Sequence, residues 1–160
     1  MHISTKCSVA AHCLIFIHEY GDQVRVTSEL LSRSTGVNAV TIRNILSGLK
    51  KAGILSVKAG TGGAELLCPP REISLYRVCA ALEPDFLSKL IGIHSSPAAL
   101  CPVGNHIHQV LDCSYQKIRE DLRRSLERIT LEQILADYHR LQGEPAAGTD
   151  TMRPRGPDPA

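Results

Sequence analysis

The hydrophobic positions between residues 5 and 52 recur at helical spacing, and they predict three consecutive helices, over 5–19, 29–34 and about 39–52. In the third helix the apolar residues recur at i, i+3, i+4 and i+7 and form one stripe: Ile42, Ile45, Leu46 and Leu49. Thr27 and Asn38 precede the second and third helices and can cap them, because their side-chain oxygens accept from unpaired backbone N–H groups. The turn between these two helices contains Gly36, as a tight helix–helix connection favours.

Two short β-prone runs follow, at 54–57 and 65–67, on either side of a glycine-rich tip. The tip, Gly60-Thr61-Gly62-Gly63, suits a hairpin because glycine reaches positive φ without strain. Helix, turn, helix and hairpin in this order is the layout of a winged helix–turn–helix, which places one helix in the major groove of DNA. A small two-helix domain with a hairpin and no such role is the alternative.

Charge favours the DNA-binding interpretation. Residues 1–60 hold seven Lys and Arg against three Asp and Glu, a balance of +4, whereas the whole chain of 160 residues carries only +2. A positive balance confined to this part of the chain favours a nucleic-acid partner. No apolar run approaches the roughly 18 residues that span a membrane, and the first 20 residues lack the apolar region of a signal peptide. We therefore expect a cytoplasmic protein with no membrane partner.

The C-terminal half contains a long helix that is expected to begin at Pro102, with Cys101 as its N-cap, and to end near Arg128. Its apolar side chains form a heptad-like seam: Leu111, Tyr115, Ile118, Leu122 and Ile129. A long helix with so narrow a seam favours pairing with the same helix of a second subunit. Packing of the seam inside its own monomer is the alternative.

Shorter elements surround this helix. A short helix is predicted at 75–82, an apolar stretch of undecided form at 86–92, and a last helix at 131–141 that opens with a Thr-x-x-Gln capping box. From 143 to 160, seven of 18 residues are Pro or Gly, a composition that favours disorder.

The predicted fold is thus mainly α with a small β-hairpin wing, a winged helix–turn–helix followed by a long dimerisation helix. Residues 1–82 form the expected DNA-binding domain, 83–142 the connector and dimerisation helices, and 143–160 a disordered tail.

Base-reading residues are expected near the start of the third helix, on the side opposite its apolar stripe. Arg43 can pair bidentately with guanine and Asn44 with adenine, whereas Lys51 and Lys58 suit phosphate groups. The full set expected to contact double-stranded DNA is Thr27, Asn38, Thr41, Arg43, Asn44, Lys51, Lys58 and Thr61. A surface ion pair between Arg43 and an acid such as Glu29 is the alternative.

The six cysteines lack the tight spacing of a secreted disulfide scaffold, so we expect reduced thiols. Cys101 is the candidate redox sensor, because a thiol at a helix N-terminus has a lowered pKa and a larger thiolate fraction. A buried, inert capping cysteine is the alternative. Cys7, Cys13 and Cys79 lie on predicted helices and are expected to be small core residues.

Enzyme chemistry finds little support. A thiol enzyme built on Cys101 with His94 or His106 would need an ordered base and a substrate-binding fingerprint, and the sequence offers neither. The histidines have no trusted metal-ligand spacing, so no metal ligand and no catalytic residue is expected.

Six segments of the chain form a further pattern, namely residues 8–14, 38–46, 49–55, 60–64, 73–78 and 101–104. Together they resemble the IscR/NsrR/CymR family of bacterial transcription regulators, the Rrf-two family, over nearly all of residues 1–141. The resemblance implies a homodimeric, sequence-specific regulator, usually a repressor. In such a regulator the third helix reads the major groove of a palindromic operator, the wing reads the minor groove, and the long helix dimerises.

Three departures from the family pattern stand out. Relatives with an iron–sulfur cluster place three close cysteines before the long helix, whereas only Cys101 lies there, so no cofactor is expected. A cluster held by Cys101 and non-cysteine residues, a metabolite or a partner protein remains an alternative effector. Ala59 replaces a wing arginine, with Lys58 one position earlier, and Ala39 replaces a proline after the capping Asn.

Overall fold

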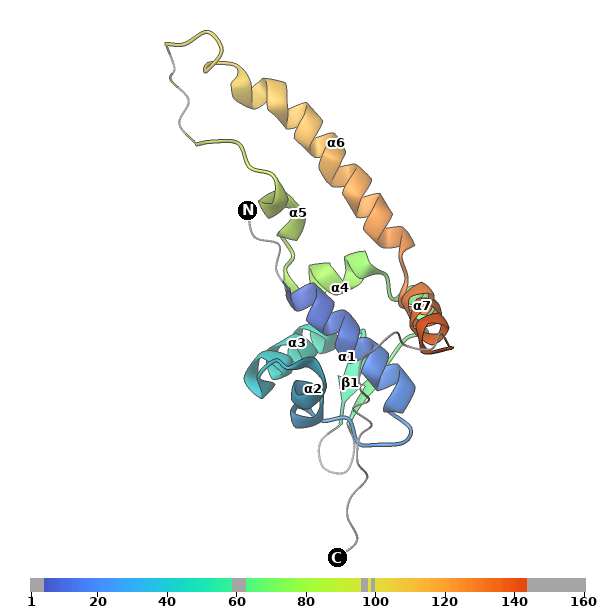
Figure 1. The fold of residues 1–160 in the computed structure, drawn as a ribbon. Coiled ribbons are helices and arrows are strands. Elements are labelled where there is room, and N and C mark those ends of the chain that lie inside the picture. The colour runs from blue at the N-terminus through green and yellow to red at the C-terminus, as the bar shows by residue number, and fades with distance from the viewer. Residues whose placement is uncertain (1–4, 59–62, 96–97, 99, 144–160) are drawn as a thin grey trace, which may run out of the picture.

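The structure is a computed structural model that describes residues 5–58, 63–95, 98 and 100–143 (Figure 1). Its elements are α1 (Lys6–Tyr20), α2 (Ser28–Thr35), α3 (Ala39–Lys51), β1 (Leu55–Val57), β2 (Ala64–Leu66), the 3-10 turn η1 (Pro70–Glu72), α4 (Leu75–Leu82), α5 (Phe86–Leu90), α6 (Ile107–Arg128) and α7 (Leu131–Gly143). The predicted mainly helical fold with a small hairpin is confirmed. Of the predicted tail only Gly143 is described, as the end of α7; residues 144–160 lie outside the described residues.

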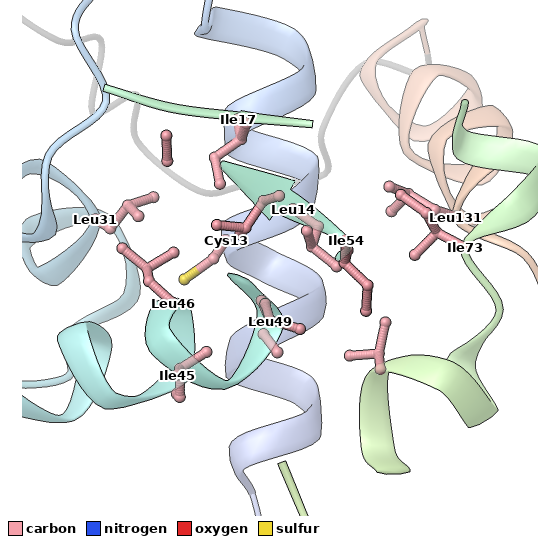
Figure 2. Close-up of a cluster of buried hydrophobic side chains, with 14 of the residues drawn as sticks. Cys13, Leu14, Ile17, Leu31, Ile45, Leu46, Leu49, Ile54, Ile73 and Leu131 are labelled. Atoms are coloured by element: carbon pink, nitrogen blue, oxygen red, sulfur yellow. The ribbon is translucent and has the colours of Figure 1, made fainter. Parts of the chain in front are cut away.

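The core fixes how α3 is rotated about its own axis. All four residues of the predicted stripe are buried, and they pack with side chains of α1 and α2 around Cys13 and Leu14 (Figure 2). Burial of one such aliphatic side chain is worth about 1.5–3 kcal/mol, so rotating the stripe toward water would be costly. The polar side of α3 is consequently held outward.

The hairpin is an antiparallel pair in which Leu55, Ser56 and Val57 face Leu66, Glu65 and Ala64. Its base is attached to the segment before α2, because the Ala64 N–H donates to the Val26 carbonyl at 3.1 Å. At Gly63 a Cβ atom would lie 2.8 Å from the Val26 nitrogen and 3.0 Å from its carbonyl oxygen. The base of the hairpin is therefore held beside the segment before α2, and glycine at 63 makes the close approach feasible.

Replacing Gly63 with Ala is expected to push the hairpin away from Val26 and to destabilise the fold by about 1–3 kcal/mol, the usual cost of overpacking. The Cβ would meet backbone atoms, which cannot swing aside as a flexible side chain could. Urea unfolding measures the effect. Gly92→Ala is the matched control, because nothing lies within 4 Å of a Cβ at that position. Equal stability of the two variants would contradict the close approach.

The C-terminal helices bring the chain back to the core. α6 begins far from the globular part and runs back toward it, and α7 lies beside α1 (Figure 1). Two backbone hydrogen bonds join the junction of α6 and α7 to the start of α4. The Leu75 N–H donates to the Ile129 carbonyl at 2.8 Å, and the Leu131 N–H donates to the Ile73 carbonyl at 2.7 Å. Leu131 and Leu135 of α7 are buried in the common core. No helix within the described ranges has the length and apolar character needed to cross a membrane.

Candidate nucleic-acid interface

The start of α3 is defined by the cap that the sequence predicts. Asn38 is extended, and its side-chain oxygen accepts from the Thr41 N–H at 2.9 Å. Thr27 caps α2 in the same way, accepting from the Leu30 N–H at 3.2 Å. These two side chains therefore hold helix ends in place, and any contact they make with DNA comes in addition to that role.

A polar surface runs along the outer side of α3. Thr41 is half-buried, whereas the residues nearer the solvent are exposed: Arg43, Asn44, Ser47, Lys50 and Lys51. Val40, at the first turn, is also exposed. We call these residues, 40, 41, 43, 44, 47, 50 and 51, the α3 outer face; they contain three positive charges and no acid.

Arg43 is paired with α2. Its Nη2 lies 2.5 Å from Glu29 Oε1, and its Nε donates to the Ser28 hydroxyl at 3.2 Å. This hydrogen bond with Arg43 is the main reason why the pKa of the Glu29 carboxyl is lowered, helped by a backbone N–H and the Ser28 hydroxyl. The structure therefore contains the surface ion pair of Arg43 with Glu29, which is the alternative to base reading that the sequence allows. Both side chains are more than half exposed, so salt or a DNA phosphate can readily displace the pair.

Lys58 is paired across the hairpin. Its Nζ lies 2.7 Å from Glu65 Oε2, and its backbone N–H donates to the Gly63 carbonyl at 3.1 Å. The ammonium group therefore lies on the stem of the wing. Thr61, the other predicted contact of the wing, lies outside the described residues, which stop at 58 and resume at 63.

The predicted dimerisation seam lies on α6 and the residue after it. No residue of α6 is buried; Leu111, Tyr115 and Leu122 are half-buried, Ile118 is 46% exposed and Ile129 is 37% exposed. Within its own chain, α6 packs chiefly against α4 and α5. The seam is therefore only partly covered by its own monomer.

Cys101 does not cap α6, and that prediction is wrong. α6 begins at Ile107, while residues 101–106 form turns in which the Asn105 N–H donates to the Cys101 carbonyl and the Ile107 N–H to that of Val103. Gly104 and Asn105 are poor helix formers, which explains the later start. The thiol is exposed, and backbone N–H groups of Gly104 first and then Val103 lower its pKa. The pKa of the Cys101 thiol is lowered, as expected, but the cause is hydrogen bonding from nearby backbone N–H groups and not the dipole of a helix.

Alkylation of the native protein is expected to reach Cys101 at a lower pH than Cys113, an exposed thiol on α6. The lowered pKa gives Cys101 a larger thiolate fraction below pH 9, and thiolate is the nucleophile. Cys13, in contrast, should stay unmodified until the protein unfolds, because burial raises its pKa to about 11. Iodoacetamide labelling at several pH values, read by peptide mass spectrometry, measures the three rates. Equal pH profiles for Cys101 and Cys113 would contradict the expectation.

The expectation of reduced thiols is wrong for two cysteines. Cys7 of α1 and Cys79 of α4 form a disulfide, 72 residues apart in sequence, so they are not the simple core residues we expected. Cys13 is a buried core residue, as predicted. The sequence spacing of Cys7 and Cys79 does not predict this disulfide, because only the packing of α1 against α4 brings the two residues together.

Metal ligands are not assembled in the described part of the chain. No group of three or more His, Cys, Asp and Glu side chains comes close enough there to hold an ion. The rings of His94 and His108 contact each other, and the His108 Nε2 pairs with the His94 carbonyl at 2.9 Å. These two histidines do not form an iron–sulfur donor set.

Comparison with known proteins places the chain among regulators. The profile of the Rrf2 family, described as iron-dependent transcriptional regulators, matches residues 3–137. YwnA, a helix–turn–helix-type transcriptional regulator of Bacillus subtilis, is 32% identical over 133 residues, which are 83% of this chain and 96% of YwnA.

Solved structures agree with this placement. A transcriptional regulator from Lactobacillus plantarum superimposes with a TM-score of 0.69 at 26% identity, covering 88% of this chain and 99% of its own. IscR of T. potens has a TM-score of 0.66 at 19% identity, covering 91% and 94%, and supports the fold alone.

Proposed function

The chain belongs to the Rrf2 family of DNA-binding transcriptional regulators, and from this premise we propose that it is a homodimeric repressor of palindromic operators. The observation that carries the proposal is the α3 outer face, basic and exposed on a helix whose opposite side is wholly buried. Such a helix can enter the major groove without disturbing the core. A protein of this kind works in the cytoplasm and has no enzymatic role.

Base reading is assigned to the N-terminal half of the α3 outer face. Arg43 leaves Glu29 and pairs with guanine, Asn44 pairs with adenine, and Thr41 contacts a neighbouring base or phosphate. Lys51 and Lys58 neutralise phosphates, and so set affinity and salt dependence rather than sequence preference. Thr27 and Asn38, the caps of α2 and α3, are also proposed to contact DNA, and Thr61 completes the proposed contact set.

Dimerisation is assigned to the α6 seam. A two-fold dimer presents two copies of α3, and their separation selects half-sites about one helical turn apart. The partial exposure of Leu111, Ile118 and the rest of the seam supports this role, because a heptad-like apolar row gains from a second helix.

Control is assigned to the Cys101 thiol. Peroxide converts its thiolate to sulfenic acid by transferring one oxygen atom and releasing hydroxide. The modified sulfur would lose the acceptor geometry that its thiolate has toward Gly104 and Val103, just before α6 begins. The start of the dimerisation helix would then shift. A metabolite, a partner protein or a cluster with non-cysteine ligands is the alternative effector.

The experiment is a binding titration of the purified protein on DNA from upstream of its own gene, with and without competitor DNA, in reduced and diamide-treated states. Tight binding that oxidation alters by a larger factor in the wild type than in Cys101→Ser supports both the regulator and the thiol control. Binding that oxidation leaves unchanged discards the thiol control. Failure to exceed competitor DNA in both states would count against the proposed operator binding.

A further inference from the structure

The disulfide between Cys7 and Cys79 lies between two helices of the DNA-binding domain. Cys7 is in the first turn of α1, Cys79 is in α4, and their Cα atoms are 5.3 Å apart. Both residues are only partly buried, so the bond is not enclosed in the core. A second link, the ion pair of Lys6 Nζ with Glu83 Oε1 at 3.1 Å, joins the same two helix ends.

Residues on either side of Cys79 connect α4 to the recognition helix α3. Two positions before it, the guanidinium of Arg77 donates to the carbonyls of Ala52 and Gly53, at 3.3 and 3.2 Å, where α3 ends. These bonds satisfy carbonyls that the helix end leaves unpaired. Moving α4 would therefore pull on the C-terminal end of α3.

On the other side of Cys79, Ala81 and Leu82 of α4 pack against Gly48 in the C-terminal half of α3. A Cβ at Gly48 would lie 3.0 Å from Leu82 Cδ2 and 3.2 Å from the Ala81 carbonyl oxygen, so α4 and α3 are in close contact there. α4 also contacts α6, which carries the proposed dimer seam. The disulfide thus fixes the helix that contacts both the recognition helix and the dimerisation helix.

The Cys7–Cys79 disulfide is better suited to a regulatory role than to a permanent structural one. In a cytoplasmic protein, disulfides are usually transient and serve catalysis or redox sensing. The ion pair beside it and the shared core keep α1 and α4 together when the sulfur bond is open, so reduction loosens α4 without unfolding the domain.

We infer that Cys7 and Cys79 form a second redox site, separate from Cys101: a reversible dithiol–disulfide pair that sets how firmly α4 holds α3. Oxidation removes two electrons and two protons from the thiols and forms one S–S bond. When a small disulfide is the oxidant, it accepts the two electrons and two protons and becomes two thiols. When a peroxide is the oxidant, an alkyl peroxide becomes an alcohol and water, and hydrogen peroxide becomes two water molecules. A dithiol reductant reverses the step and becomes a disulfide itself. The consequence for DNA binding rests on the proposed function, whereas the sulfur chemistry does not.

The sulfur chemistry is tested on the full-length wild-type protein. It is reduced with dithiothreitol, reoxidised with oxidised glutathione, quenched with iodoacetamide at each stage and mapped by mass spectrometry. The expected result is a Cys7–Cys79 linked peptide that disappears and returns while the protein stays folded, with Tm lower by about 10 °C in the reduced state, given the 72-residue separation. Two alkylated thiols after oxidation, or a bond that native-state dithiothreitol cannot open, would overturn the inference.

The consequence for DNA is tested in a Cys101→Ser background, on a duplex recovered by selection from random-sequence DNA. The reduced and oxidised proteins should differ at least fivefold in affinity. Adding Cys7→Ser or Cys79→Ser should abolish the difference, and adding Cys113→Ala, the control, should keep it. No difference in the Cys101→Ser background would overturn the link to DNA. If no DNA binds in any state, the proposed function fails, and the peptide map with the melting shift decides the redox site.

Arg77→Gln tests whether the state of the Cys7–Cys79 bond reaches α3 through the hydrogen bonds of Arg77. This variant should still form and open the Cys7–Cys79 bond, yet its affinities in the two states should differ less than twofold, because the bonds to Ala52 and Gly53 are lost. A merely structural role of Arg77 would instead lower both affinities together and keep their ratio. That outcome would refute transmission through Arg77.

Discussion

Replacing Leu111 and Ile118 together with Glu is expected to convert the protein to a monomer and to lower its affinity for a palindromic operator by at least about a hundredfold. Linking two half-site readers gains a factor of roughly 10² to 10⁴ through effective concentration, and the monomer forfeits it. Two carboxylates in the α6 seam would lose solvation if the helices paired. The monomer should remain folded, because no residue of α6 is buried.

Sedimentation equilibrium and DNA titration measure the two effects side by side. Gln109→Glu with Gln116→Glu is the matched control, since it adds the same two charges, also seven residues apart, at exposed positions of α6 outside the seam. This control should stay dimeric and keep its operator affinity. A dimer that survives Glu at 111 and 118 would contradict the assignment of the seam and favour its packing within one monomer.

Arg43→Ala is expected to reduce specific affinity by roughly 5- to 150-fold, the range for loss of one bidentate base contact. Its effect on competitor DNA should be small, because only one positive charge is removed. The ion pair with Glu29 does not oppose this role, since both partners are largely exposed and the pair is open to exchange.

Arg33→Ala supplies the comparison for Arg43→Ala. Arg33 is an exposed arginine in the last turn of α2, outside the α3 outer face, so its loss changes net charge equally. Anisotropy titrations on specific and competitor duplexes at two salt concentrations separate base reading from charge. Equal losses on both duplexes for Arg43→Ala would show that Arg43 contributes charge alone.

The DNA-binding part of the fold could be predicted because its signals are local. The Asn38 cap and the spacing of Ile42, Ile45, Leu46 and Leu49 specify α3 within one residue of its observed end. The capping box before α7 is formed too, with the Thr130 N–H donating to Gln133 Oε1 at 3.1 Å and the Gln133 N–H to Thr130 Oγ1 at 3.4 Å. Each of these interactions spans three or four residues.

What the sequence did not predict depends on contacts between distant segments. Cys7 and Cys79 meet only after α1 packs on α4, and no spacing rule links residues 72 apart. Pro102, at an apparent first helical position, predicts a start of α6 five residues before the observed one, because that signal takes no account of the weak helix formers Gly104 and Asn105. The pairing of Arg43 with Glu29 is one of two roles that the sequence allows for Arg43, and local sequence cannot decide between them because the two side chains meet across the turn between α2 and α3.

Selection from a random pool of double-stranded DNA tests the central claim most directly. The full-length protein is used in its reduced and oxidised states, and the bound DNA is sequenced after several rounds. The account predicts enrichment of a palindrome whose half-site centres lie about 10 base pairs, or a multiple of that, apart. Enrichment of no motif in either state would contradict the claim that this protein is a sequence-specific, dimeric regulator.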